Sequence, residues 1–203
     1  MLADKAAAVT LTIAITALAL IGVSKASAGQ MFTQDVTPLY AAAQGSGGIG
    51  SLSPGTAVMP SGTPQAAHAR SEVVVEGWSI QGADAVLYSA VGRRIVLATL
   101  ETAAPQETLI AEQRDDYGTV WRHVRLVGWV DATHLVPDAA SVWSSAQKLY
   151  AARCSACHAL HAPAEFTANQ WPGILRTMVR NAALDPEQTA LVTRYLQEHA
   201  RAQ

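Results

Sequence analysis

The chain has 203 residues, 50% of them hydrophobic, and its 14 Lys and Arg against 16 Asp and Glu leave a net charge of −2 at pH 7. This balance excludes the basic surface of a nucleic-acid-binding protein, and the length allows one domain or two small ones. Six Arg against eleven acidic residues give residues 29–139 a net charge of −5, whereas six basic and four acidic residues give 140–203 a net charge of +2. This difference in sign indicates two modules.

The N-terminus has the pattern of an export signal. Lys5 precedes an apolar stretch over residues 6–23, and Ala26-Ser27-Ala28 supplies small residues at the spacing that signal peptidase prefers. An apolar stretch of this length lies between a signal-peptide core of about 7–15 residues and a membrane span of about 17–25. We therefore expect residues 1–28 to be a signal peptide cleaved after Ala28, or a signal anchor that associates with the inner membrane through residues 6–23. Both alternatives place the protein in the periplasm.

Residues 29–137 have the texture of a β-rich module. Short β-branched and apolar runs recur between turn-forming residues, which is typical of a small barrel or sandwich. Ser53-Pro54-Gly55-Thr56 predicts a type II turn with Gly55 at positive φ, and Asp115-Asp116-Tyr117-Gly118 predicts another turn. The Gly-Thr pair and a terminal Gly-Trp-Val resemble SH3-like barrels.

After Pro137 the pattern becomes helical. Asp138 or Ser141 can cap a first helix, residues 171–179 form a second helical stretch, and Asp185 has the signature of a capping box for a third. The first predicted helix places four apolar side chains on one face: Val142, Ala146, Leu149 and Tyr150.

The motif with the clearest chemistry follows the first predicted helix. Cys154 and Cys157 project from one side of a helical turn, so their thiols can bond the two vinyl groups of one haem, and His158 can turn its imidazole to the iron. A thioredoxin-like redox pair would need a preceding strand, and a zinc site would need two further ligands at motif spacing. The sequence therefore predicts one covalently bound haem c.

The sixth iron ligand is predicted from position. Met178 is the only methionine after the motif, and a thioether ligand raises the potential of a haem. The alternative is that Met178 only packs in the core. His161 is too close to the proximal ligand, His199 lies near the C-terminus, and His123 and His134 belong to the β module.

Four other side chains are weaker candidates for the same site. Trp171 and Tyr150 could hydrogen-bond a haem propionate, although core packing is the favoured interpretation. Arg176 and Arg180 could pair with propionates or dock an acidic partner, although a solvated charge is the default interpretation.

Together these patterns predict an α+β multidomain fold: an SH3-like, β-barrel-type module over 29–137, then an all-α, monohaem cytochrome c-type domain over 138–203, preceded by one N-terminal apolar helix. We expect an electron carrier without catalytic residues, since no cluster of acid, base and nucleophile is evident. The alternatives are a generic membrane-anchored electron shuttle for another terminal enzyme, and a haem-based redox or gas sensor.

Two stretches resemble a known family. VEGWSIQGADAVLYSAVGRRIVLATL (75–100) and CSACHALHAPAEFTANQWPGILRTM (154–178) are similar to the C-terminal haem domain of the pentahaem c-type cytochromes that donate electrons to periplasmic trimethylamine-N-oxide and dimethyl-sulfoxide reductases. The resemblance implies that Cys154, Cys157 and His158 are the haem-binding motif and that Met178 is the distal ligand. It also implies a periplasmic molybdoreductase as electron acceptor.

The chain departs from that family in its number of haem motifs. It has one Cys-x-x-Cys-His instead of five, so the tetrahaem part that oxidises quinol is missing. We therefore expect the electron donor to be a separate quinol-oxidising or multihaem cytochrome.

Overall fold

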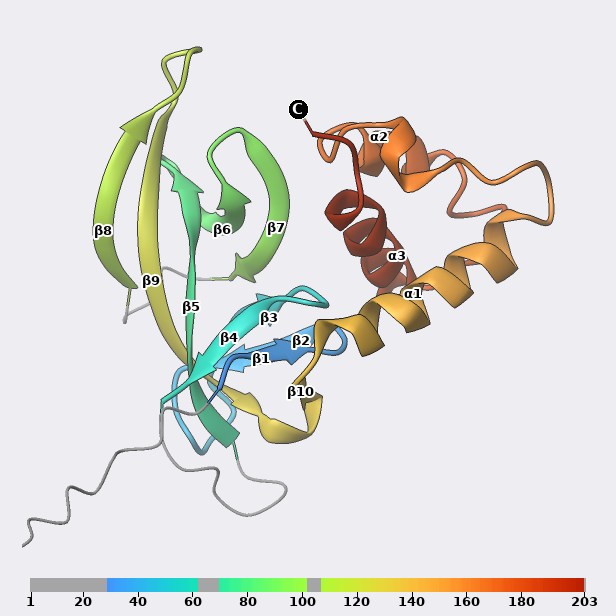
Figure 1. Ribbon diagram of the computed structural model, residues 1–203. Helices are drawn as coiled ribbons and strands as arrows, with labels where there is room; N and C mark the ends of the chain where they lie inside the picture. Colours follow the sequence, from blue (N-terminus) through green and yellow to red (C-terminus); the bar gives the residue numbers. More distant parts are fainter. Residues whose placement is uncertain (1–28, 62–69, 102–106, 203) are drawn as a thin grey trace, which may run out of the picture.

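The computed structural model describes residues 29–61, 70–101 and 107–202 (Figure 1). The predicted signal segment, including the apolar stretch over 6–23, lies outside these residues. The strands are β1 (Met31–Thr33), β2 (Thr37–Tyr40), β3 (Gly48–Leu52), β4 (Ala57–Pro60), β5 (Arg70–Ile80), β6 (Ala83–Ala90), β7 (Arg93–Leu100), β8 (Glu107–Arg114), β9 (Val120–Asp131) and β10 (Leu135–Val136). The helices are α1 (Ala139–Cys154), α2 (Trp171–Arg176) and α3 (Pro186–Glu198), with 3-10 turns at Ala132–His134 and Pro163–Glu165.

The strands form one antiparallel sheet that closes on itself. Its order is β10-β1-β4-β5-β6-β7-β3-β2-β9-β8, and an additional pairing joins β5 to β9. That pairing runs from Arg70 opposite Asp131 to Ile80 opposite Trp121. The strands β5, β6, β7, β3, β2 and β9 therefore make a six-stranded barrel, in which closure removes most of the exposed strand edges.

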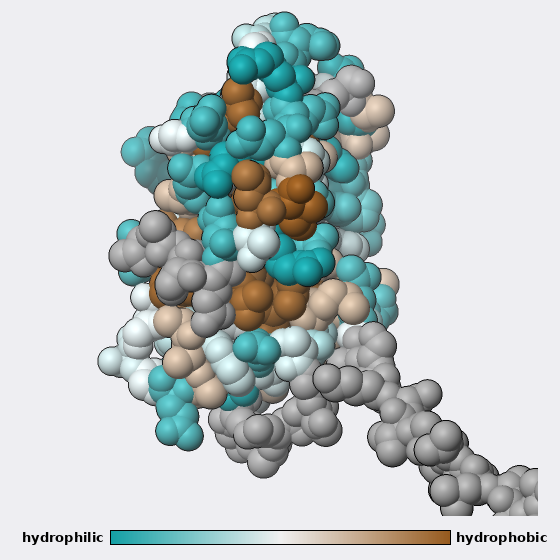
Figure 2. Space-filling model, turned by 90° about the vertical axis from the view of Figure 1, so that its left-hand side faces the viewer, coloured by the Kyte–Doolittle hydropathy of each residue, from teal (hydrophilic) through white to brown (hydrophobic). Residues whose placement is uncertain are grey.

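The barrel interior is filled by alternate side chains of its long strands, because successive side chains of a strand point to opposite faces. The buried core of the barrel consists of Leu39, Ile49, Leu52, Val58, Val73, Val75, Leu87, Ala98, Leu100, Val124, Leu126 and Val130. Strand β8 stays at the outer edge, and its Leu109 and Ile110 are each 46% exposed. Figure 2 faces the side on which β8 lies and shows apolar patches there among mostly hydrophilic residues.

The predicted turns and helix caps are confirmed. Gly55 has φ +69°, and the amide of Thr56 donates to the carbonyl of Ser53 at 3.2 Å. Asp138 accepts a hydrogen bond from the amide of Ala140 at the start of α1, and Asp185 forms a capping box at the start of α3. These local signals depend on neighbouring residues only, which is why the sequence predicts them well.

The predicted fold class is wrong. The described residues are mostly β, and the helical segment (residues 138–202) holds three short helices of 16, 6 and 13 residues and not an all-α cytochrome c-type domain. Between α1 and α2 the chain forms turns, a 3-10 turn and an isolated bridge of Thr167 to Arg201, and no helix. Apolar periodicity locates individual helices, but it does not reveal how much of a segment stays non-helical or which surface covers the helices.

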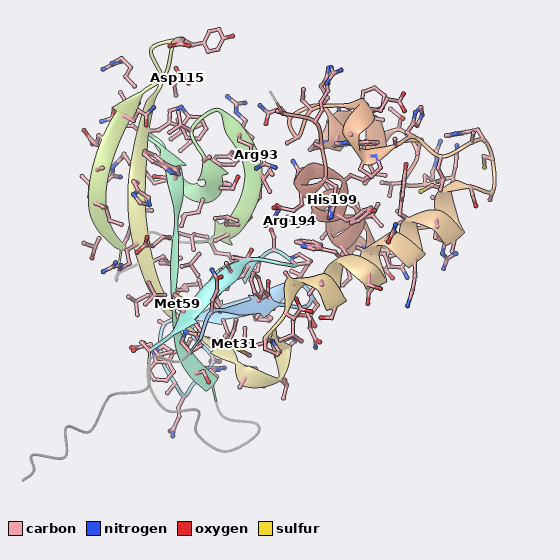
Figure 3. All side chains as sticks on the ribbon, viewed as in Figure 1. Met31, Met59, Arg93, Asp115, Arg194 and His199 are labelled. Atoms are coloured by element: carbon pink, nitrogen blue, oxygen red, sulfur yellow. The ribbon has the colours of Figure 1, made fainter. Side chains whose placement is uncertain are left out.

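The barrel covers one side of the helical segment at a surface that we call the helix–barrel junction, made by Gly55, Arg93, Trp143, Arg194 and Gln197. Figure 3 shows Arg93 of β7 close to Arg194 of α3 where the helices meet the barrel. Arg194 is 5% exposed; it donates to Glu198 at 2.9 Å and, at 3.4 Å, to the carbonyl of Gly55. The helices therefore depend on the barrel for part of their burial.

Gln197 and Asn169 add further hydrogen bonds across the same junction. The Gln197 side-chain amide donates to the carbonyls of Arg94 and Ala168 at 3.3 and 3.0 Å. Asn169 donates to the carbonyl of Gly92 and accepts from the amide of Arg94, both at 2.8 Å. The bonds to Gly92 and Arg94 join side chains of the helical segment to the β6–β7 turn and the start of β7, whereas the bond to Ala168 lies within the helical segment.

We expect Gly55→Ala to lower the free energy of unfolding by about 2–4 kcal/mol, because it combines an overpacking clash with a strained backbone. A Cβ at Gly55 would overlap the Cη2 atom of Trp143, and its φ of +69° disfavours a side chain. Gly82→Ala is the matched control, since Gly82 has φ +82° and a Cβ added there would meet nothing within 4 Å. Urea denaturation measures both; equal losses in the two variants would mean that the Trp143 contact is unimportant.

Candidate functional site

The predicted haem motif begins at the last residue of α1. The buried residues of α1 repeat every four positions, Val142, Ala146, Tyr150 and Cys154, which places the thiol of Cys154 over the core of the helical segment. Cys154 is 9% exposed, whereas Cys157 is exposed in the following turn, and both are free thiols. Burial raises the pKa of the Cys154 thiol, with a smaller contribution from the nearby Cys157.

His158 follows Cys157 directly in the chain, and its ring donates a hydrogen bond through Nδ1. Its Nδ1 lies 2.7 Å from the backbone carbonyl of Ala159, and the side chain is exposed. A carbonyl oxygen can only accept, so Nδ1 carries a proton, and in the neutral imidazole Nε2 then has the lone pair that a metal needs. Metal-bound histidines commonly donate their second ring N–H in this way. Two free thiols and this imidazole fit the donor set of a haem c.

A series of aromatic contacts connects the motif with the helical core. The ring of His161 lies 5.4 Å from that of His158 and 5.5 Å from that of Phe166, and Phe166 lies 5.0 Å from Trp171. Trp171 is fully buried. The loop between α1 and α2 is therefore held against the core by ring packing.

Trp171 and Tyr150 have structural roles in this core. The indole N–H of Trp171 donates to the carbonyl of Pro163 at 2.8 Å, and the phenol of Tyr150 donates to the carbonyl of His161 at 2.9 Å. Both rings are buried, so the core-packing interpretation of the two residues is confirmed. Their donors already satisfy backbone carbonyls of the loop that carries His161 and Pro163.

Met178 comes from a different segment, in the turns between α2 and α3. Its amide donates to the carbonyl of Leu175 at 2.8 Å, its carbonyl accepts from the amide of Ala182 at 2.9 Å, and its side chain is half-buried. Cys154, Cys157 and His158 thus lie in the segment that follows α1, and both the haem attachment there and Met178 as distal ligand stay predictions.

The other histidines occupy different surroundings. His123 stacks on Trp78 on the barrel, with ring centroids 4.8 Å apart, and His134 lies 2.7 Å from Asp35. His199 follows α3 and packs against Tyr195 and Trp143 at the helix–barrel junction (Figure 3).

One feature of this region was not predicted from the sequence. A shallow hollow of about 340 Å³ lies between α2 and α3, and we call it the α2–α3 hollow. It is lined by Pro172, Leu175, Arg176, Val179, Arg180, Thr189 and Thr193. Its two arginines, and likewise its two threonines, are four positions apart in the sequence, which predicts that each pair lies on one face of a helical turn. Nothing in the sequence predicts that the two segments lie against each other.

Alkaline pH is expected to weaken the fold through Tyr150. Burial raises the pKa of Tyr150 to about 12, with smaller contributions from Cys154, Glu165 and Tyr195. Because the unfolded phenol ionises near pH 10, the stability from the neutral phenol is fully present below pH 10 and is lost as pH rises through 12. Urea denaturation at pH 8 and pH 11 should show this fall in wild type.

Tyr150→Phe should reduce that fall and cost about 1 kcal/mol at pH 8 through the lost hydrogen bond to His161. Tyr117→Phe is the control, because Tyr117 is 96% exposed. If the free energy of unfolding falls as much between pH 8 and pH 11 in Tyr150→Phe as in wild type, ionisation of Tyr150 is not the cause of the fall.

Within the described ranges, no helix is long and apolar enough to cross a membrane. The apolar stretch predicted over residues 6–23 lies outside those ranges.

Comparison with known proteins gives two family matches. A family model described as TorC third cytochrome c domain matches residues 25–135, and one described as dihaem cytochrome c matches residues 150–203. The first match covers the barrel, which contains no cysteine, and the second contains the Cys154–His158 motif. No solved structure matches the chain significantly.

Curated relatives agree with these matches. The cytochrome c-type protein TorY of Escherichia coli O157:H7 is 35% identical over 131 residues, which are 64% of this chain and 36% of TorY. TorC of Escherichia coli K12 is 28% identical over 177 residues, 86% of this chain and 45% of TorC. TorY of Haemophilus influenzae is 28% identical over 129 residues, 63% of this chain and 35% of that protein. The chain thus spans less than half the length of each of these relatives.

The resemblance predicted from residues 75–100 and 154–178 is confirmed by these matches. They likewise support the assignment to electron transport, cytochrome c and haem binding.

Proposed function

The chain belongs to the family described as the TorC third cytochrome c domain, and we propose that it is a periplasmic monohaem c-type cytochrome that relays single electrons to a molybdenum S/N-oxide reductase. The observation that carries the proposal is the segment Cys154–His158 at the end of α1, which holds two free thiols and a histidine whose Nδ1 donates to a carbonyl. The resemblance to cytochromes that feed such reductases supports the choice of acceptor.

Each residue of the motif has a defined part in this proposal. Cys154 and Cys157 would hold the haem through thioether bonds, and His158 and Met178 would be the ligands of its iron. The bound haem supplies a one-electron couple. The two cysteines of the sequence form a single motif, which supports one haem.

Covalent attachment suits the position of the motif in the fold. Cys154 lies within the apolar cluster of the helical segment, with Trp171, Leu175 and Leu196. A haem bonded to Cys154 would add its apolar surface to this cluster, and the buried side chains of the cluster would exclude water from that part of the haem.

The proposed donor is a quinol-oxidising or multihaem cytochrome. The sequence carries one Cys-x-x-Cys-His, whereas the family that it resembles oxidises quinol through four additional haems. The N-terminal signal pattern supports export.

Stopped-flow mixing tests the proposal. The pre-reduced holoprotein is mixed with a purified molybdenum reductase and its N-oxide or S-oxide substrate, and the haem absorbance is followed. We expect reoxidation that depends on both the reductase and its substrate. Reoxidation that is absent with this acceptor, but rapid with another terminal enzyme, would instead support the generic electron shuttle.

A further inference from the structure

The α2–α3 hollow combines an apolar floor with a cationic rim. Leu175 is 1% exposed and forms the floor with Val179, while the exposed side chains of Arg176 and Arg180 border the opening. On the α3 side, the hydroxyls of Thr189 and Thr193 donate to the backbone carbonyls four residues earlier. Their donors are thus used within the helix, and only the two guanidinium groups offer donors to a ligand.

Both guanidinium groups are available for an anion. The ion pairs described for the helical segment join His161 to Glu165 and Arg194 to Glu198, and neither Arg176 nor Arg180 has a carboxylate partner within the parts of the chain that the structure describes. Arginine binds carboxylates through two parallel hydrogen bonds, so a pair of free arginines can bind a carboxylate of another molecule.

Two arginines on the barrel are already paired with neighbouring carboxylates, Arg122 with Asp84 at 3.0 Å and Arg125 with Glu76 at 2.7 Å. The net charge is −5 over residues 29–139 and +2 over residues 140–203. An acidic protein surface is therefore attracted to the helical segment and repelled by the barrel.

The hollow is lined by residues on both sides of Met178, the predicted distal ligand of the iron. Arg176 and Arg180 stand two residues on either side of Met178. The floor residue Leu175 belongs to the same buried cluster as Cys154. A partner seated in the hollow is therefore separated from the haem-bearing core by the thickness of that cluster.

We propose that the α2–α3 hollow is the docking site for the electron acceptor, and that it receives an acidic side chain of that protein together with an adjacent apolar one. Arg176 and Arg180 bind the carboxylate, and the apolar side chain covers Leu175 and Val179. This inference rests on the proposed function, because it gives the surface through which the electron leaves.

The test compares holoprotein variants in the stopped-flow reoxidation assay at low and at physiological ionic strength. Arg176→Glu/Arg180→Glu is expected to lower the second-order rate constant about tenfold or more at low ionic strength and to weaken its salt dependence. Arg176→Gln/Arg180→Gln removes the charge without reversing it and should give a smaller loss in the same direction. Haem spectra and thermal melting establish that each variant is folded.

A matched control separates local docking from overall charge. Arg180→Glu and Lys148→Glu change the net charge equally, and Lys148 is an exposed residue of α1 that does not line the hollow. We expect a loss of several-fold in Arg180→Glu and a change of less than about twofold in Lys148→Glu, because only the former removes a contact of the docked carboxylate. Equal losses in the two variants would overturn the inference.

Arg176 and Arg180 could instead bind the propionate carboxylates of the chain's own haem. The midpoint potential of the haem distinguishes this pairing from the binding of a partner's carboxylate. An unchanged potential in Arg176→Glu/Arg180→Glu with a slower reaction supports docking. A shifted potential with an unchanged dependence on acceptor concentration would overturn docking in favour of propionate pairing. If the reductase reoxidises the wild type and the arginine variants equally fast, the proposed docking site is wrong and the proposed function stands. If the reductase does not reoxidise the wild type, the proposed function and the docking site are both wrong.

Discussion

Replacing Cys154 and Cys157 with alanine is expected to abolish covalent haem attachment and to remove most of the ordered helical structure. Thioether bonds need both thiols, and a helical segment of this size buries too little apolar surface to be stable by itself without a cofactor. Its buried cluster includes Cys154 together with Trp171, Leu175 and Leu196, so the haem would complete this core.

Haem-dependent staining after denaturing electrophoresis measures attachment, and far-UV circular dichroism measures helix content. Ser155→Ala is the control, because Ser155 lies in the same turn and is exposed. The barrel has a separate buried core and should stay folded, so the β signal should persist. Native-like helicity and cooperative melting in the double variant would contradict the expectation that the haem stabilises the helical segment.

The second large effect is expected from Met178→Ala. Loss of a thioether ligand should lower the midpoint potential on the order of 100 mV, within the range of about 0.8 V over which axial ligands set haem potentials. It should also open the sixth coordination position, so that the reduced protein binds CO rapidly and its oxidised spectrum changes from low spin.

Met59→Ala is the matched control, because Met59 lies on strand β4 of the sheet and is 43% exposed. If Met178→Ala leaves both spectrum and potential unchanged, Met178 is only a packing residue. Rapid CO binding by the unmodified protein would favour the alternative of a gas sensor, whereas a fully coordinated haem supports electron transfer.

The barrel identifies the family more clearly than the haem motif does. The family model with a TorC description ends at residue 135, nineteen positions before Cys154. The helix–barrel junction connects this matched region to the haem motif, because the buried side chains of Arg194 and Gln197 in α3 donate to the carbonyls of Gly55 and Arg94. The barrel is thus a structural support for the segment that carries the motif.

Features that depend on neighbouring residues could be predicted from the amino-acid sequence. The positive φ of Gly55, the caps at Asp138 and Asp185, and the β texture of the first module are each encoded within a few positions. The Cys154–His158 motif is of the same kind, because two thiols and an imidazole on adjacent turns are sufficient to predict haem attachment.

The arrangement of the strands and helices relative to one another depends on contacts between residues far apart in the sequence. Only the tertiary structure shows these contacts. Closure of the barrel needs β5 to pair with β9 across about fifty residues of chain, and no local pattern specifies that pairing. The error in fold class has the same origin, because burial of α3 against β7 and the turn at Gly55 arises from residues far apart in the sequence. The α2–α3 hollow also exists only where two separate segments meet, since its shape depends on long-range packing that periodicity does not encode.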